Sequence, residues 1–123
     1  MPLNLIQDAR RASTLPALQT IETLRDIDPD FPLVACLIFL AVAGASEPPT
    51  MQELQQVTDA PQSTISRCVQ MMSARSVHRA GKRQVKPGHD IVRSFEDPLD
   101  TRFKRVELTP KGKALLRRLQ AIS

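Results

Sequence analysis

The chain has 123 residues, with 17 Lys and Arg against 13 Asp and Glu, a formal net charge of +4, and four Phe without Trp or Tyr. This length is typical of one domain with its own core, and the scarcity of aromatic rings argues against a protein that stacks the bases of single-stranded nucleic acid. No secretion-signal pattern and no apolar run of about 20 residues occurs, so we expect a cytoplasmic protein without a membrane span.

The first 30 residues are expected to form a helical segment. Apolar side chains recur there at spacings of three, which is typical of amphipathic helices. Pro16 is expected to bend or split the run, because its ring is not accommodated in a helix interior. Asp28-Pro29-Asp30 predicts a turn. The run 31–43 is apolar on nearly all sides, which predicts a buried helix that Gly44 ends.

Two helices joined by a tight turn are predicted next. Thr50-Met51-Gln52-Glu53 matches the reciprocal capping box and opens a helix over 51–57. After the turn 58–61, a second helix is expected over 62–75. One face of this second helix offers hydroxyls, an amide and a guanidinium, and the helix contains no acid. Solvent-facing helices usually mix Glu with Lys, so this face favours a helix-turn-helix whose second helix enters the DNA major groove.

The segment after the second helix is strongly basic. Ten Lys and Arg stand against four acids between Arg67 and Arg105, a local charge of +6. Residues 77–79 predict a short strand, and residues 80–89 predict a basic loop punctuated by Gly and Pro. Phosphate contacts, which add affinity without sequence choice, are expected from Arg79, Lys82, Arg83 and Lys86.

The most specific pattern lies in the last third of the chain. Asp97-Pro98-Leu99-Asp100 predicts a turn. The residues from Arg102 to Leu108 alternate as in a strand, which is expected to pair with residues 90–96. Thr109-Pro110 then predicts an N-cap and the first position of a final helix that runs to the end of the chain.

This order of elements is that of a winged helix-turn-helix, mainly α with a small β-hairpin wing, and it predicts a single domain over 1–123. From about residue 31 to the end, the chain resembles the MarR family (multiple antibiotic resistance regulators). Ser63-Thr64-Ile65-Ser66-Arg67 is similar to the family's recognition-helix signature. Asp97-x-x-Asp100-x-Arg102, followed by Val106-x-Leu108-Thr109-x-x-Gly112, resembles its wing and the start of the next helix.

The resemblance implies a homodimeric transcriptional regulator, such as a repressor, that binds double-stranded DNA with its recognition helices in major grooves and its wing arginines in flanking minor grooves. The expected recognition-helix contacts are Gln62, Ser63, Thr64, Ser66, Arg67 and Gln70. The expected wing contacts are Asp100, Thr101, Arg102 and Lys104. Asp100 matches the aspartate that holds the wing arginine, and Arg102 matches that arginine. A guanidinium gains most in a narrow minor groove, where the potential is strongly negative.

Some features depart from the family pattern. The chain ends soon after the final helix begins, so dimerisation is expected to rely on residues 1–30 and the short last helix, or to be absent, with 31–123 as the winged-helix body. Pro61 stands where the family commonly has a capping Ser or Thr. Family members often sense a small molecule, and nothing in this sequence identifies a pocket for such an effector.

Two alternatives stay open. The first is a winged-helix protein-interaction module, for instance a phage or plasmid protein that modulates a host regulator or polymerase. The second is a replication or partition initiator, which would share the DNA contacts. We expect no metal, cofactor or catalytic site, because His78 and His89 have no nearby Cys partner and no nucleophile elbow or phosphate loop occurs. The two cysteines are expected to be reduced thiols.

Overall fold

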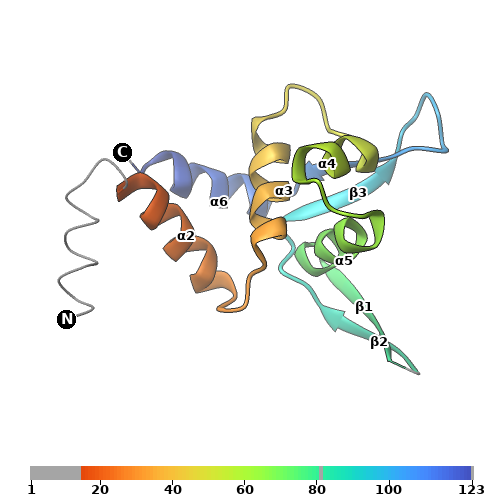
Figure 1. The fold of residues 1–123 in the computed structure, drawn as a ribbon, viewed down its shortest axis with the longest axis horizontal. Helices are drawn as coiled ribbons and strands as arrows, with labels where there is room; N and C mark the ends of the chain where they lie inside the picture. Colours follow the sequence, from red (N-terminus) through yellow and green to blue (C-terminus); the bar gives the residue numbers. More distant parts are fainter. Residues whose placement is uncertain (1–14, 81, 123) are drawn as a thin grey trace.

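The computed structural model describes residues 15–80 and 82–122. Its elements are α2 (Leu15–Ile27), α3 (Leu33–Gly44), α4 (Met51–Thr58), α5 (Gln62–Met72), β1 (Arg75–Ala80), β2 (Lys82–Pro87), β3 (Val92–Glu96), β4 (Lys104–Leu108) and α6 (Pro110–Gln120). In Figure 1, α2 and α6 lie toward one end of an elongated molecule, and two β-hairpins project toward the other. This architecture confirms the predicted winged helix-turn-helix.

The helices begin where the chemistry of their first residues allows it. The Thr50 hydroxyl accepts from the Glu53 amide, and the Glu53 carboxylate accepts from the Thr50 amide, both at 3.1 Å, which confirms the capping box. The Thr109 hydroxyl accepts from the Gly112 amide at 3.0 Å and opens α6. Pro16 lies in the first turn of α2, where its missing N–H costs nothing. The residues before Leu15 lie outside the described part of the chain.

The core lies where α3, α4 and α5 meet the inner ends of β3 and β4. Its largest fully buried side chains are Leu24, Ile38, Phe39, Leu54, Ile65, Met72, Ile91, Val92 and Val106. α3 forms as predicted, but the expected burial holds for one side of the helix only, with Ala35, Ile38, Phe39 and Val42 buried. Leu33, Leu37 and Leu40 are 71%, 40% and 41% exposed, because the other elements cover only one side of this helix.

The strands form two separate antiparallel hairpins. β3 pairs with β4 from Val92 opposite Leu108 to Glu96 opposite Lys104, which confirms the predicted partner of the wing strand. β4 starts at Lys104 rather than Arg102, because residues 97–103 form a broad turn.

The second hairpin, β1 with β2, corrects the prediction of a basic loop over residues 80–89. Arg79, Lys82, Arg83 and Lys86 lie in its paired strands. α5 ends at Met72, earlier than expected, and the strand begins at Arg75. Pro87 ends β2 and Gly88 follows it, so these residues mark the end of a strand rather than a loop interior.

None of the helices in the described ranges combines the length and apolarity that a bilayer crossing requires. Within the same ranges, no group of three or more His, Cys, Asp or Glu is placed to hold a metal ion. His89 instead has a packing role. Its ring stacks on Phe31 with centroids 6.0 Å apart, and its Nε2 lies 3.2 Å from the Asp28 carboxylate.

Candidate nucleic-acid interface

The tip of the β3–β4 wing, residues 97–103, is fixed by hydrogen bonds of its own. The Asp97 amide donates to the Phe103 carbonyl at 2.9 Å and closes the turn. The Asp97 carboxylate accepts from the Leu99 amide at 2.8 Å, as aspartates in turns commonly do. Arg102 therefore stands on an ordered tip, not within the strand.

Arg102 is held by Asp100 in a two-point ion pair. Its Nε donates to Oδ1 at 3.0 Å and its terminal nitrogen donates to Oδ2 at 2.7 Å, and the Arg102 amide also donates to Oδ1 at 3.1 Å. The guanidinium lowers the pKa of Asp100, and the carboxylate raises the pKa of Arg102. Asp100 uses two of the five guanidinium N–H donors. The Arg102 side chain is 82% exposed, so it remains able to bind an external acceptor in a preset orientation.

A second aspartate–arginine pair anchors the wing to the rest of the domain. Asp97 is only 8% exposed, and its carboxylate accepts from the Arg105 Nε at 2.8 Å. The Arg105 guanidinium also donates to the Pro48 carbonyl at 2.6 Å, and the Val106 amide donates to the Pro49 carbonyl at 3.0 Å. These contacts fix the base of the wing against the connector between α3 and α4. The Leu99 amide and the Arg105 side chain lower the pKa of Asp97.

The sequence pattern did not reveal this anchor. The local pattern predicts Asp97 as a member of the turn and of the wing motif, and Arg105 as one charge of the basic segment. The sequence does contain one indication of this ion pair. Asp97 precedes the hairpin tip and Arg105 follows it, eight residues later. That spacing can bring the two side chains together, whereas their partner at Pro48 is too distant in the chain to be inferred.

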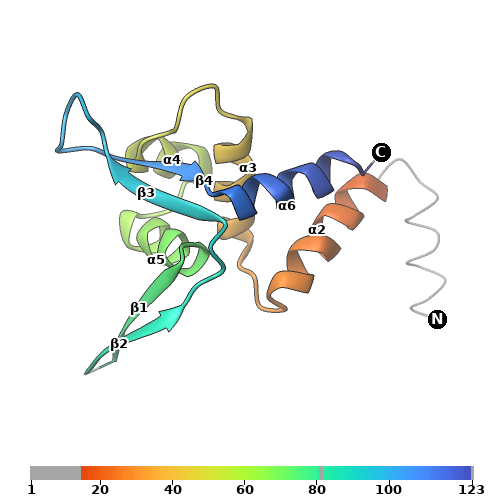
Figure 2. The ribbon, with the colours of Figure 1, turned by 180° about the vertical axis from the view of Figure 1, so that it is seen from behind.

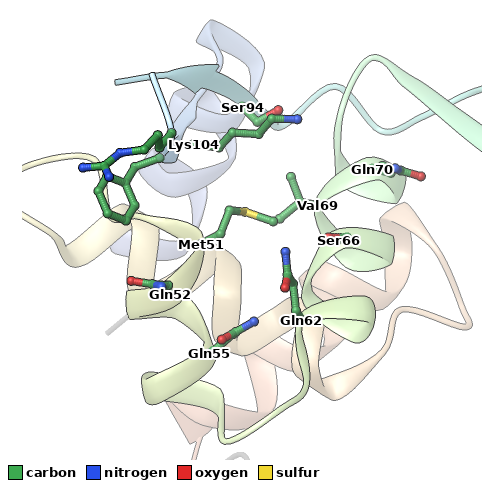
Figure 3. Close-up of a pocket in the computed structure, with 11 residues that line it drawn as sticks. Met51, Gln52, Gln55, Gln62, Ser66, Val69, Gln70, Ser94 and Lys104 are labelled. Atoms are coloured by element: carbon green, nitrogen blue, oxygen red, sulfur yellow. The ribbon is translucent and has the colours of Figure 1, made fainter. Parts of the chain in front are cut away.

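A groove of about 390 Å³ runs between α4, α5 and the wing. It is lined by Met51, Gln52, Gln55, Gln62, Ser66, Val69, Gln70, Ser94, Arg102, Phe103 and Lys104. Figure 3 shows Met51 and Val69 pointing toward one another between the two helices, with Gln55 and Gln62 beside them. The predicted recognition-helix residues Gln62, Ser66 and Gln70 thus share one surface with the wing residues Arg102 and Lys104.

Gln52, Gln55 and Ser94 are polar lining residues of this groove that the sequence interpretation missed. The glutamines stand on α4, where the capping box identified the start of the helix and not its outward face. Ser94 stands on β3, whose partner strand carried the motif. Amide and hydroxyl groups both donate and accept, so they suit a ligand with mixed hydrogen-bonding edges.

The remaining recognition-helix residues face other directions. Ser63 is exposed, and Thr64 and Arg67 line a second cavity of about 290 Å³ with Pro32, Val34, Cys68 and Met71. Burial raises the pKa of the Cys68 thiol, so this thiol stays protonated at neutral pH. The predicted contact set therefore divides between the wing side and the α3 side of α5.

The acids near this face lie beside cations, including Glu96, which is directly opposite Lys104 in the β3–β4 register. Asp97 and Asp100 are the acids of the wing tip, and each is paired with an arginine. Lys104 lines the groove and Arg67 is exposed on α5. Thr101 lies exposed on the wing tip. The backbone of β1 and β2 is described, whereas the side chains of Arg79, Lys82, Arg83 and Lys86 lie outside the described part.

The sequence of the chain matches no family model, and it matches no curated protein. Comparison with solved structures gives several matches of the fold, all at low sequence identity. PcaV, a transcriptional regulator from Streptomyces coelicolor, is 17% identical at a TM-score of 0.58, with 99% of this chain and 74% of that chain covered. Against PcaV in complex with its natural ligand, the match covers 74% of this chain and about half, 54%, of that regulator.

Two further regulators match over most of the chain. The transcriptional regulator PA3341 is 23% identical at a TM-score of 0.56, with 89% of this chain and 73% of that chain covered. The MarR family transcription regulator SP03579 is 18% identical at a TM-score of 0.57, with 96% and 69% covered. The chain therefore has the winged-helix fold of MarR-type transcriptional regulators, as its motifs predicted.

Proposed function

We propose that this chain is a sequence-specific regulator of transcription that binds double-stranded DNA as a homodimer. One observation carries the proposal: an exposed arginine, Arg102, is held in one orientation on an anchored wing tip, beside a helix without acids. The likeness to transcriptional regulators supports the same class of function.

In this proposal α5 enters the major groove. Gln62, Ser66 and Gln70, on the wing side of this helix, are assigned to base edges. The exposed Ser63 and Arg67 lie beside that row and are assigned to base edges or phosphates. Glutamine pairs well with adenine and arginine with guanine, because each presents two hydrogen-bonding atoms at the required spacing. Thr64, half-buried beside α3, is assigned to the DNA backbone.

The wing then reaches the adjacent minor groove. Arg102 enters it, because a narrow minor groove concentrates negative potential. Asp100 does not contact DNA in this assignment. It orients Arg102 before binding, which lowers the conformational entropy lost in the complex. Thr101 and Lys104 are assigned to phosphates at either side of the tip.

The dimer is assigned to residues 1–30, the segment that contains α2. The tips of the two hairpins point away from α2 and from the C-terminal end of α6, so association at that end leaves the α5 face open (Figure 1). Ile21 on α2 is 50% exposed and offers an apolar contact there. Sedimentation equilibrium checks the assignment, with a mass twice the 13.7 kDa of the chain expected.

Selection from a random pool of duplexes tests the proposed function. We expect the wild-type chain to enrich one sequence family and to bind a duplex of that sequence, here called the selected duplex, with an affinity that falls steeply with salt. Arg102→Ala is expected to weaken this binding by about 10-fold to 100-fold. Arg117→Ala, an exposed arginine on α6, is the matched control and should bind like the wild type. Equal binding by wild type and Arg102→Ala would refute the wing assignment.

A second function is favoured by a different observation. The exposed apolar row of Leu33, Leu37 and Leu40 on α3 suits contact with another protein. A winged-helix protein-interaction module would use such a row and would not enrich any duplex. The same selection experiment therefore separates the two functions.

A further inference from the structure

The β1–β2 hairpin has a charge pattern that the recognition helix and wing do not explain. Between Arg75 and Pro87 the chain carries five Lys and Arg and no acid. Its register sets Arg75, Arg79 and Arg83 on one face, and Lys82 and Lys86 on the other. Neither face is apolar, so the pattern is not that of a strand pair packed on a core.

In the β1–β2 hairpin, two residues of like charge also lie opposite one another. Arg79 and Arg83 occupy directly paired positions. Like charges directly opposite in an antiparallel pair destabilise it, and an isolated two-stranded hairpin is only marginally stable. An anion bound along the hairpin would remove this repulsion, so the register favours a polyanionic partner.

The root of the hairpin is fixed to the end of α5. The Gly88 amide donates to the Ala74 carbonyl at 3.0 Å, and the His89 amide donates to the Met71 carbonyl at 3.0 Å. The Ile91 amide donates to the Met72 carbonyl at 2.8 Å, which satisfies another carbonyl at the helix end. A Cβ on Gly88 would lie 1.7 Å from the Ser73 carbonyl oxygen, so the approach requires glycine. The direction of the hairpin is therefore fixed by its backbone hydrogen bonds to the end of α5.

The hairpin and the wing flank α5 on opposite sides. Figures 1 and 2 show the tips of both hairpins pointing away from α2 and α6 and diverging from each other, with α4 and α5 between them. Six residues per strand give the hairpin a length of about 20 Å, against a major-groove width of about 12 Å. A duplex whose major groove holds α5 thus has a phosphate backbone within reach of the hairpin.

We infer that the β1–β2 hairpin is a second DNA-binding element, which contacts the phosphate backbone on the side of α5 opposite the wing. This inference rests on the proposed function. Phosphates are assigned as the ligand because the chain from Arg75 to Pro87 carries five cations and no acid, and most polar contacts of proteins to DNA go to the sugar-phosphate backbone. Its contribution is sequence-independent affinity, while α5 and the wing select the site.

The experiment compares two charge-neutralised pairs in the full-length chain, Arg79→Gln with Arg83→Gln, and Lys82→Gln with Lys86→Gln. Anisotropy titrations from 50 to 200 mM KCl use the selected duplex and a mixed-sequence duplex of equal length. Each lost phosphate contact reduces the slope of log K against log salt by about 0.9. A pair that loses two contacts is expected to reduce the slope by about 1.8, so the affinity advantage of the wild type changes about 12-fold over this range.

Three further readouts distinguish the outcomes. The loss should be equal for both duplexes, and hydroxyl-radical footprints should lose protection on the side away from the wing. Lys113→Gln with Arg117→Gln on α6 makes the same charge change and should leave the slope unaltered. Circular dichroism and thermal melting establish that each variant is folded.

A reduced slope in either hairpin pair, with the sequence preference retained, supports the inference. Unchanged slopes in both pairs, while Arg102→Ala weakens binding, overturn the inference and leave the proposed function standing. Failure of the wild type to bind either duplex overturns both. Binding of the hairpin to RNA or to an acidic protein, with no effect of the variants on duplex affinity, also overturns it.

Discussion

The two hairpins of this domain have the same antiparallel topology, but they differ in how they are attached to the domain and in whether their cations are paired with acids. The wing has Val92 and Val106 fully buried in the core, and its tip acids are matched by arginines. The β1–β2 hairpin contains no acid between Arg75 and Pro87, and the backbone bonds of residues 88–91 attach its root to α5. Because the wing packs into the core, it can hold one side chain, Arg102, in a fixed position. The β1–β2 hairpin is attached through its base, and it contributes positive charge to DNA binding. We therefore assign specificity to the first and affinity to the second.

The largest expected effect separates these two roles. Arg102→Ala should reduce the ratio of affinities for the selected and the mixed-sequence duplex by about 10-fold or more, because a groove-inserted arginine contributes roughly 1–3 kcal/mol. The paired hairpin variant Arg79→Gln with Arg83→Gln should leave this ratio unchanged and lower both affinities. Competition titrations measure the ratio. If the hairpin variant changes this affinity ratio as much as Arg102→Ala does, the assignment of specificity to the wing alone is contradicted.

The wing is attached to the core through Val106, and this attachment predicts the second-largest effect, a loss of stability. Val106→Ala removes two buried carbons from a side chain with no exposed surface, and it should lower the free energy of unfolding by about 2 kcal/mol. Urea denaturation measures this change. Leu99→Ala, at a tip residue that is 96% exposed, is the control and should leave stability unaltered. Similar losses in both variants would contradict the anchored wing.

Attachment of the second hairpin through its root predicts a smaller effect. Gly88→Ala brings a Cβ against the Ser73 carbonyl and should cost about 1–2 kcal/mol of stability. It should also lower the salt dependence of DNA binding, because the hairpin is no longer aimed. Gly44→Ala is the matched control, since a Cβ there meets nothing within 4 Å. A salt dependence equal to that of the wild type would show that the root does not direct the hairpin.

The smallest expected effect is on the pH dependence of stability. The Leu99 amide and Arg105 lower the pKa of Asp97 in the folded state, below the ordinary value of about 3.9. The stabilisation is therefore complete above the unfolded-state pKa and is lost as the pH falls through the lower folded-state pKa. Thermal melts between pH 3 and 7 should show a smaller acid-induced fall in Tm for Asp97→Asn than for the wild type. Parallel curves would contradict the anchor.

Much of the recognition unit could be predicted because its signals are local. The capping box at Thr50, the N-cap at Thr109 and the motif around Arg102 each depend on residues a few positions apart. The partner of Asp100 was also predictable, because Arg102 is two residues away. Local chemistry of this kind is visible in one sequence.

The missed features depend on contacts between distant residues. Arg105, the partner of Asp97, is also bound to the Pro48 carbonyl, 57 residues away. The glutamines of α4 matter only because α5 and the wing form a groove beside them. The β1–β2 hairpin lacked the apolar alternation by which strands are usually found, so its cations and its Gly and Pro indicated a loop. The exposed row on α3 escaped notice because an apolar run does not show which side is covered.

NMR mapping of the 15N-labelled chain tests the central claim most directly. On addition of the selected duplex, we expect amide shifts to concentrate in α5 from Gln62 to Gln70 and in the wing from Leu99 to Lys104. The amides of α2 and α6 should move little. Shifts centred on the exposed row of α3 or on α2, with α5 and the wing unmoved, would contradict the assignment of this face to DNA.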